Sequence, residues 1–161
     1  MKFEGEVWRH IPAGAHPLNL RYILKASGRW NRAGIYGCLY TSLSELGARA
    51  EFDKYLLKSG LSIALINPRE IVSIIAKVNN VLDITSPNNG YVHPDELYLV
   101  GDEAGHIEKC HKLADAARLA GYVGLLVPSA AIDNERNLII YIDGPPDEID
   151  LDVGGKRILI S

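Results

Sequence analysis

Residues 35–57 read IYGCLYTSLSELGARAEFDKYLL, and this stretch combines a strand with a helix. Ile35–Tyr40 is rich in aromatic and branched side chains, which predicts a buried strand. Ser42 and Glu45 have the spacing of a capping box, in which a hydroxyl and a carboxylate satisfy exposed backbone amides. We therefore expect a helix that runs to about the end of this stretch and stops before Gly60.

The segment before this stretch is expected to contain a strand and two loops. Val7–Arg9 predicts a short opening strand. Pro12 and Pro17 favour a loop that continues through residue 27, because proline cannot donate a ladder hydrogen bond. Residues 28–34, GRWNRAG, have a glycine at each end and predict an exposed loop.

The segment after this stretch is expected to add a second helix and several strands. Residues 71–78 alternate in polarity, which predicts a half-buried strand with Ser73 and Lys77 on its exposed face. Apolar residues recur at helical spacing over about 106–120, and Gly121 supplies a stop signal. Composition indicates the remaining elements: a turn at 86–90, strands at 122–127 and 138–142, and a hairpin between Ile149 and Ile160 around Gly154-Gly155. Strands outnumber helices without regular alternation, so we predict a single α+β domain over 1–161.

Composition and charge argue against several classes of protein. The chain of 161 residues is 47% hydrophobic and 23% charged, which are ordinary values for a globular domain. Its net charge is −3, so we expect neither direct nucleic-acid binding nor attraction to an acidic membrane. The N-terminal residues are too polar for a signal peptide, and no apolar run approaches the roughly 18 residues of a membrane span. A cytoplasmic protein is expected.

The cysteine and histidine residues do not form a recognised framework. Cys38 and Cys110 are the only cysteines, which favours reduced thiols in the cell interior. His106, Cys110 and His111 lie close together, but residues five apart do not share a helix face, and no zinc motif is present. We therefore expect solvated surface histidines and no metal. The glycine fingerprints of dinucleotide-binding folds and phosphate-binding loops are also absent, which argues against an NAD-using dehydrogenase or an ATPase.

Four residues stand at positions suited to chemistry. Arg29 lies on a glycine-hinged loop, from which a guanidinium fork can reach a phosphate. Tyr40 stands at the mouth of its predicted strand, where the ring can stack on a flat ligand. Glu51 lies on a helix face whose preceding turn carries only small residues, and Ser129 follows a strand and a proline.

Each of these residues also has an ordinary structural interpretation. Most loop arginines are solvated, and Trp30 can be a core anchor. A mid-helix glutamate such as Glu51 is usually a surface residue. A serine before a turn usually caps the backbone. None of these residues alone supports a functional assignment.

Taken together, the motifs resemble the RES domain family, which is named for its arginine, glutamate and serine. The first block comprises GRWNRAG at 28–34, LYTS at 39–42 and Ala50-Glu51. The second block comprises LADAAR at 113–118, Gly121-Tyr122, GLL at 124–126, PSA at 128–130 and Asn137-Leu138. In order and approximate spacing, the resemblance covers residues 7–141.

The resemblance implies an NAD-consuming toxin of a type II toxin–antitoxin pair. The implied fold is similar to that of ADP-ribosyltransferases, with a split β core and flanking helices that grip NAD in a cleft. NAD is the implied substrate, and no cofactor is required. The partner would be an Xre-like helix-turn-helix antitoxin, and a homodimer is expected. Members break the nicotinamide–ribose bond by hydrolysis or phosphorolysis, or transfer ADP-ribose to a protein; an inert binding module is a further alternative.

The resemblance also assigns roles to individual residues. Arg29 would hold the pyrophosphate of NAD, and Tyr40 would pack beside the nicotinamide or its ribose. Glu51 would stabilise the positive charge that develops on the ribose, and Ser129 would make an orienting hydrogen bond. These four residues are expected to converge on one cleft.

The first block contributes further candidates for NAD binding. Trp30 and Asn31 adjoin the arginine of the motif. The loop before this block, Lys25–Gly28, is less rich in glycine than in many members of the family. Arg9 and Arg32 are therefore rival candidates for the phosphate contact.

Overall fold

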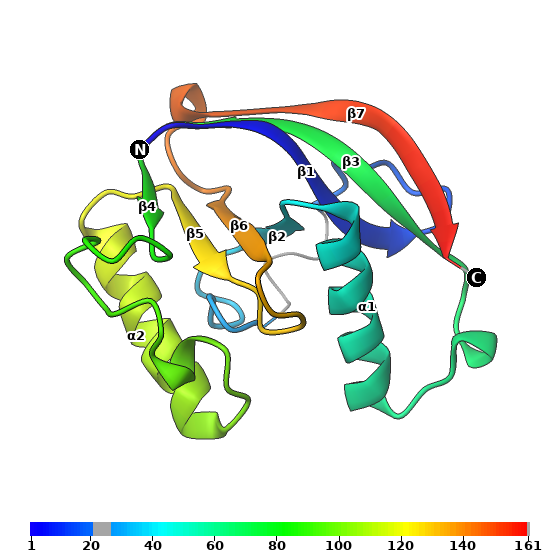
Figure 1. The fold of residues 1–161 in the computed structure, drawn as a ribbon. Coiled ribbons are helices and arrows are strands. Elements are labelled where there is room, and N and C mark those ends of the chain that lie inside the picture. Colours follow the sequence, from blue (N-terminus) through cyan, green and yellow to red (C-terminus); the bar gives the residue numbers. More distant parts are fainter. Residues whose placement is uncertain (21–26, 161) are drawn as a thin grey trace.

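The computed structural model describes residues 1–20 and 27–160, and its centre is a seven-stranded mixed sheet with two long helices (Figure 1). The sheet order is β4-β5-β6-β2-β1-β3-β7. The elements are β1 (Phe3–Pro12), β2 (Cys38–Ser42), α1 (Glu45–Ser59), β3 (Arg69–Val78), β4 (Val81–Asp83), α2 (Ala104–Leu119), β5 (Gly124–Pro128), β6 (Arg136–Tyr141) and β7 (Ile149–Ile160). Short 3-10 helices occur at Ile63–Leu65, Leu97–Leu99 and Pro146–Glu148. The predicted α+β class is confirmed.

The sheet divides into two parts between β1 and β2. In the described part of the chain, these two strands register only at Trp8 opposite Ser42. By contrast, β1 and β3 register along the whole of Phe3–Pro12, and β2 and β6 along the whole of Cys38–Ser42. The strands β4-β5-β6-β2 and β1-β3-β7 therefore form two half-sheets, which is the split core that the resemblance implies.

Three apolar clusters fix the helices against the half-sheets. Helix α2 packs on β4-β5-β6-β2, and α1 packs on β1 and β3; Figure 1 shows the two helices well separated beneath the sheet. A third cluster joins both half-sheets through buried residues that include Val7, Ile74, Leu126 and Ile140. Complete burial of one such side chain contributes about 1.5–3 kcal/mol. These clusters hold the framework on which the polar residues are placed.

The beginning of α1 differs from the predicted capping box. Ser44 is the N-cap, and its hydroxyl accepts a hydrogen bond from the amide of Gly47. Ser42 cannot take this role because it is the last residue of β2 and registers with Asn137. The end of α1 lies close to the predicted position, because the helix ends at Ser59 and Gly60 adopts the left-handed conformation at φ 67°.

The first two strands also differ from their predicted limits. β1 extends over Phe3–Pro12, whereas the sequence predicted a strand only over residues 7–9. β2 begins only at Cys38, and Ile35 is 70% exposed in the preceding turn, so the expected buried strand from Ile35 is wrong. Residues 21–26 of the predicted loop lie outside the described residues.

The predicted hairpin around Gly154-Gly155 is wrong. β7 is one strand that pairs with β3 on both sides of these glycines, and the register shifts between Val72 and Ile74. Ser73 is fully buried at this irregularity, which contradicts its predicted exposure. A Cβ atom on Gly154 would collide with Ser73, so the absence of a side chain permits this close approach.

Neither of the two long helices, nor any other helix in the described ranges, is long and apolar enough to cross a membrane.

Candidate active site

A cleft of about 630 Å³ lies along the boundary between the two half-sheets. Its walls come from β1, β2, α1 and residues 27–31, and its volume is in the range of sites for small ligands. Five residues that were predicted from the sequence line this cleft: Arg9, Arg29, Asn31, Tyr40 and Glu51. The division of the sheet therefore creates the space in which these side chains meet.

The carboxylate of Glu51 is held by two side-chain donors from the opposite half of the molecule. Its Oε1 accepts a hydrogen bond from Asn137 Nδ2 at 2.8 Å and from Ser129 Oγ at 3.1 Å. Its Oε2 has no hydrogen-bond partner among the described residues. One oxygen is thus fixed by the protein, and the other remains available to a ligand in the cleft. Asn137 was not predicted as a site residue.

Ser129 is both a backbone cap and a partner of Glu51. Its hydroxyl accepts hydrogen bonds from the amides of Ala131 at 3.1 Å and Ile132 at 3.3 Å, and it donates to Glu51. The side chain is buried and does not line the cleft. Ser129 therefore positions Glu51 and does not itself reach the cleft.

Ser129→Ala removes one of the two donors that orient Glu51. For the NAD cleavage that the resemblance implies, we expect kcat to fall by about 10-fold or more, since one hydrogen bond to a charged group is worth about 1.5–3 kcal/mol and about 1.4 kcal/mol is a factor of ten. KM should change little, and the melting temperature should fall by a few degrees as the amides of Ala131 and Ile132 lose their acceptor. Steady-state kinetics with Ser86→Ala, a turn residue outside the cleft, provide the control. Unchanged kcat would show that Asn137 alone positions the carboxylate.

The hydroxyl of Tyr40 is enclosed by the loop that carries Arg29. It accepts a hydrogen bond from the amide of Trp30 at 2.8 Å and donates to Asn31 Oδ1 at 2.8 Å. A Cβ atom on Gly28 would overlap this hydroxyl, which explains the glycine there. Burial raises the pKa of Tyr40 well above its usual value, so the phenol is neutral. Tyr40 as a whole residue is 37% exposed and lines the cleft, where its ring can pack against a flat ligand.

The guanidinium of Arg29 is committed to the chain that precedes α2. Its Nη1 donates to the carbonyl oxygen of Gly101 at 2.6 Å, and its Nη2 donates to Asp102 Oδ1 at 3.0 Å. The same carboxylate oxygen accepts hydrogen bonds from Lys54 and Lys58 of α1 at 2.9 and 3.2 Å. Burial acts to raise the pKa of Asp102, but the two lysines hold it below its usual value. Asp102 thus links Arg29 on one wall of the cleft to α1 on the other.

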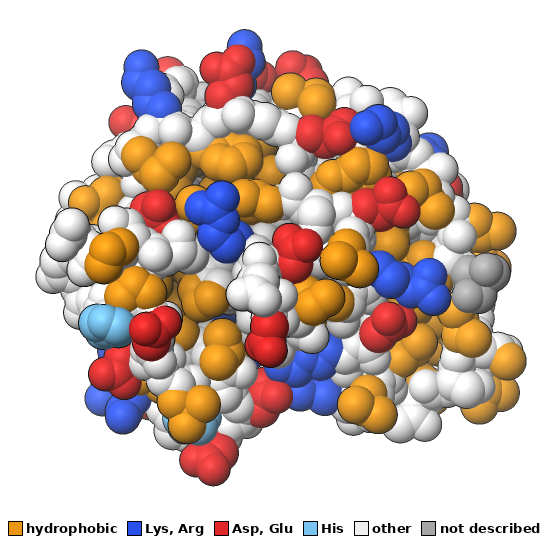
Figure 2. Space-filling view, viewed as in Figure 1, with side chains coloured by type: hydrophobic (Ala, Val, Ile, Leu, Met, Phe, Trp, Pro, Cys, Tyr) orange, Lys and Arg blue, Asp and Glu red, His pale blue; other side chains and the backbone are white. Residues whose placement is uncertain are grey.

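Positively charged side chains are also visible on the surface of the molecule. In Figure 2, Lys and Arg side chains gather between the positions that α2 and α1 occupy in Figure 1, beside acidic side chains. In the cleft, Arg29, Lys54 and Lys58 all pair with one carboxylate, that of Asp102. The cleft is therefore basic although the chain as a whole has a net charge of −3.

Two predicted candidates for NAD binding do not reach the cleft. The side chain of Trp30 is 2% exposed and belongs to the core beneath α2, as in its ordinary interpretation. Arg32 pairs with Glu108 of α2 at 2.9 Å and with Asp115 at 3.5 Å. Its guanidinium is therefore engaged by carboxylates of α2 and does not line the cleft. Asn31 lines the cleft and is buried, where it holds Tyr40.

The cleft contains a basic pair that includes Arg69, which the sequence did not indicate. Arg9 Nη1 donates to the carbonyl oxygens of Pro17 and Asn19 at 3.3 and 3.4 Å. Arg69 Nη2 lies 2.8 Å from His10 Nδ1. Burial, followed by the charges of Arg69 and Arg9, lowers the pKa of His10 to about 3, so the imidazole is neutral and its Nδ1 accepts this hydrogen bond.

The histidines of α2 do not follow the predicted surface placement. His111 is buried, and its Nε2 lies 2.7 Å from the carbonyl oxygen of Gly28. It therefore supports the loop that encloses Tyr40. Within the described ranges, no group of three His, Cys, Asp or Glu side chains could hold a metal ion. Cys38 and Cys110 are both buried free thiols.

Comparison with known proteins identifies the family of this chain and a solved structure with a similar fold. The RES domain matches residues 6–156. A protein of Mycobacterium tuberculosis (strain H37Rv) named "Probable NAD(+) phosphorylase" is 27% identical over 146 residues, which are 89% of this chain and 68% of that protein. A chain in the crystal structure of the M. tuberculosis MbcT–MbcA toxin–antitoxin complex aligns with a TM-score of 0.73 and 19% identity, over 99% of this chain and 86% of that chain. Because the RES domain matches nearly the whole chain, this protein belongs to the RES domain family.

Proposed function

We propose that this protein is an enzyme that breaks the nicotinamide–ribose bond of NAD in the cleft between the half-sheets. The observation that carries the proposal is the carboxylate of Glu51, which has one oxygen fixed by Ser129 and Asn137 and the other without a protein partner among the described residues. The similarity to a protein named as an NAD(+) phosphorylase supports the same substrate.

The chemistry of NAD suits a fixed carboxylate. Nicotinamide is bound to ribose as a cation, so the C1′–N bond breaks with its electron pair moving to the departing nitrogen. Positive charge then develops on the ribose. Glu51 Oε2, bound to the ribose hydroxyls, stabilises that charge, and a prepositioned group needs little reorganisation during the reaction. The neutral ring of Tyr40 packs beside the nicotinamide or its ribose.

Arg9 is the stronger candidate among the three predicted phosphate contacts. It lines the cleft, and its hydrogen bonds to carbonyl oxygens are long, at 3.3 and 3.4 Å. Arg29 is engaged with Gly101 and Asp102, and Arg32 is paired on the outer side of the loop. In this proposal Arg9 binds the pyrophosphate, and Arg29 maintains the shape of the cleft.

The acceptor of the ADP-ribosyl group decides the reaction type. Attack of water at C1′ gives ADP-ribose and a proton, and attack of inorganic phosphate gives ADP-ribose phosphate. A protein side chain would be the acceptor if the chain is an ADP-ribosyltransferase. The name of the M. tuberculosis relative favours phosphate.

Incubation of the purified protein with NAD tests these alternatives. We expect nicotinamide release, with chromatography and mass spectrometry distinguishing ADP-ribose from its phosphate ester when inorganic phosphate is present or omitted. Mass analysis of added proteins detects transfer. Absence of nicotinamide release under all three conditions would contradict the proposed activity and favour an inert binding module.

The biological role proposed here is that of a toxin in a type II toxin–antitoxin pair. The likeness in fold to a chain of a toxin–antitoxin complex supports this role. An Xre-like helix-turn-helix antitoxin would cover the cleft, and the toxin would form a homodimer. Because the net charge is −3, operator DNA would be bound by the partner. Sequence-selective DNA binding by the pure protein in a gel-shift assay would contradict this role, and light scattering measures the oligomeric state.

A further inference from the structure

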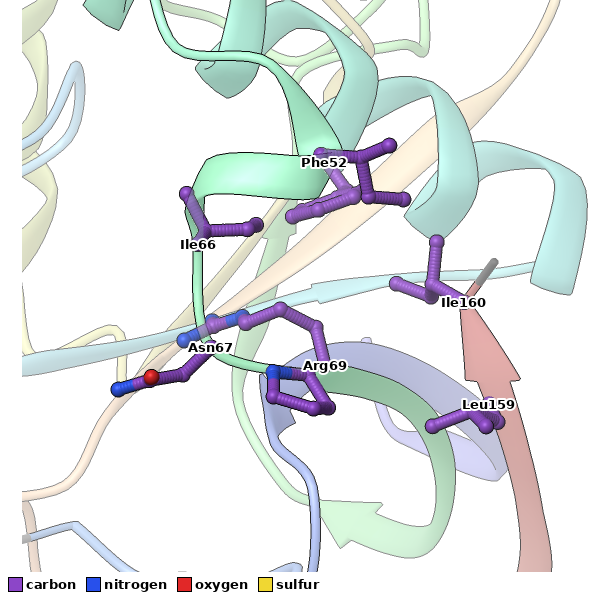
Figure 3. A pocket seen from close by; sticks show the side chains of 8 residues that line it. Phe52, Ile66, Asn67, Arg69, Leu159 and Ile160 are labelled. Carbon is purple, nitrogen blue, oxygen red and sulfur yellow. The ribbon is translucent and has the colours of Figure 1, made fainter.

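Arg69 stands where the cleft meets a second, smaller cavity. This cavity of about 280 Å³ is lined mainly by apolar side chains, among them Phe52, Ile66, Leu159 and Ile160. In Figure 3, the side chain of Arg69 runs away from Leu159 and Ile160. Arg69 also belongs to the walls of the larger cleft. Its stem thus covers apolar surface while its charged end leads toward the cleft.

The guanidinium of Arg69 is incompletely satisfied by the protein. Its Nη2 contacts His10 Nδ1 at 2.8 Å and the carbonyl oxygen of His10 at 3.4 Å. Its Nε is buried and has no hydrogen-bond partner among the described residues. No carboxylate among those residues forms a salt bridge with Arg69, and the sequence of 21–26, RYILKA, contains no acidic residue. Burying a cation without an anion is costly, so this arrangement favours the binding of an anion.

Arg9 adds a second positive charge near Arg69. Burial, and then the charge of Arg69, lowers the pKa of Arg9 to about 10. Neither arginine has a carboxylate partner among the described residues. His10, which contacts Arg69 and follows Arg9 in the sequence, is neutral and cannot compensate their charge. Two partly buried guanidinium groups therefore share one unneutralised region of the cleft.

We infer that Arg69, together with Arg9, binds a phosphate group in the cleft. The guanidinium fork matches the spacing of two phosphate oxygens. This phosphate belongs either to the pyrophosphate of NAD or to inorganic phosphate that acts as the acceptor. The choice between these two sources rests on the proposed function, whereas the anion site itself does not.

The bound phosphate would lie close to Glu51 along α1. The ring of His10 is 6.1 Å from that of Tyr55, measured between centroids. Tyr55 follows Glu51 by one helical turn, and both line the cleft. The anion site and the carboxylate therefore belong to one ligand-binding surface.

Calorimetric titration of the purified protein tests this inference with two probes, ADP-ribose and inorganic phosphate. In Arg69→Gln, we expect the dissociation constant of one probe to rise by about 10-fold or more, as expected for the loss of a charged hydrogen bond. Weaker binding of ADP-ribose identifies the pyrophosphate as the bound group. Weaker binding of inorganic phosphate identifies the acceptor and should be accompanied by a raised KM for phosphate. Arg49→Gln removes the same charge from the exposed side of α1 and should change either constant by less than about two-fold.

Unchanged binding of both probes by folded Arg69→Gln would overturn the inference. If this variant does not fold, Arg69→Met removes the charge but keeps an apolar stem against the smaller cavity, and unchanged binding of both probes in it would have the same consequence. Nicotinamide release by the wild-type protein is measured separately. Absence of that release would refute the proposed NAD cleavage, while weakened anion binding in the variant would still support the phosphate site.

Discussion

Glu51→Gln is expected to reduce the rate of nicotinamide release by about 10²–10³, which is the usual cost of removing a prepositioned group that stabilises charge in the transition state. Glutamine retains an Oε1 that accepts the hydrogen bonds from Ser129 and Asn137, so its side chain keeps the same placement. The negative charge that would face the ribose is lost. The effect should therefore appear in kcat, with the melting temperature within a few degrees of that of the wild type.

The control for this variant is Glu45→Gln on the same helix. Glu45 is exposed in the first turn of α1 and lies outside the cleft. Single-turnover and steady-state measurements should show near wild-type rates for it. Near-normal turnover in well-folded Glu51→Gln would show that Glu51 has no part in the chemistry, and the mechanism proposed here would be wrong.

Asn137→Asp is expected to reduce nicotinamide release by about 10² at neutral pH, because it replaces a donor by a carboxylate oxygen 2.8 Å from Glu51 Oε1. Two carboxylates at this distance cannot both ionise without strong repulsion, so the pair retains a proton and one pKa rises. The retained proton is shared between the two carboxyl groups, so Glu51 carries less negative charge. The isosteric change isolates this electrostatic effect from any change in volume.

The same variant should show a distinctive dependence of stability on pH. A carboxyl pKa raised in the folded state contributes stability that is present below the unfolded pKa, about 4, and is lost as the pH rises through the folded value. The deficit in melting temperature relative to wild type should therefore be smallest near about pH 4 and should grow toward neutral pH. Asn88→Asp, in an exposed turn, should show no such trend. A pH-independent deficit would show that residue 137 does not share a proton with Glu51.

Local sequence signals predict α1 and α2 well but fail where long-range pairing decides the structure. Gly60 marks the end of α1 because its left-handed conformation is a local property. Gly154-Gly155 has the composition of a turn, yet β3 keeps β7 continuous through it and buries Ser73. No pattern within β7 alone reveals that partner.

The same distinction applies to the candidate site. Glu51 and Ser129 were singled out by their positions in the sequence and given roles by the family resemblance, and the structure places them in hydrogen-bond contact. Arg69 and His10 have no local signal, since their importance arises only when β1 and β3 pair and bring them to one cleft. Arg29 shows the reverse case, because its loop suggested an open phosphate contact, whereas the chain before α2 occupies its guanidinium.

The order in which the chain leaves the ribosome has a consequence for the carboxylate of Glu51. Its two donors follow it by 78 and 86 residues, on the segments around β5 and β6. Contacts of such large sequence separation form late, since closing long loops costs entropy before the contact repays it. A nascent chain that ends before β6 lacks Asn137, which donates a hydrogen bond to Glu51. It also lacks β6 itself, the strand that pairs with β2. The site is therefore assembled only after most of the chain has been synthesised, and fragments released by premature termination before β6 would carry Glu51 without its complete support.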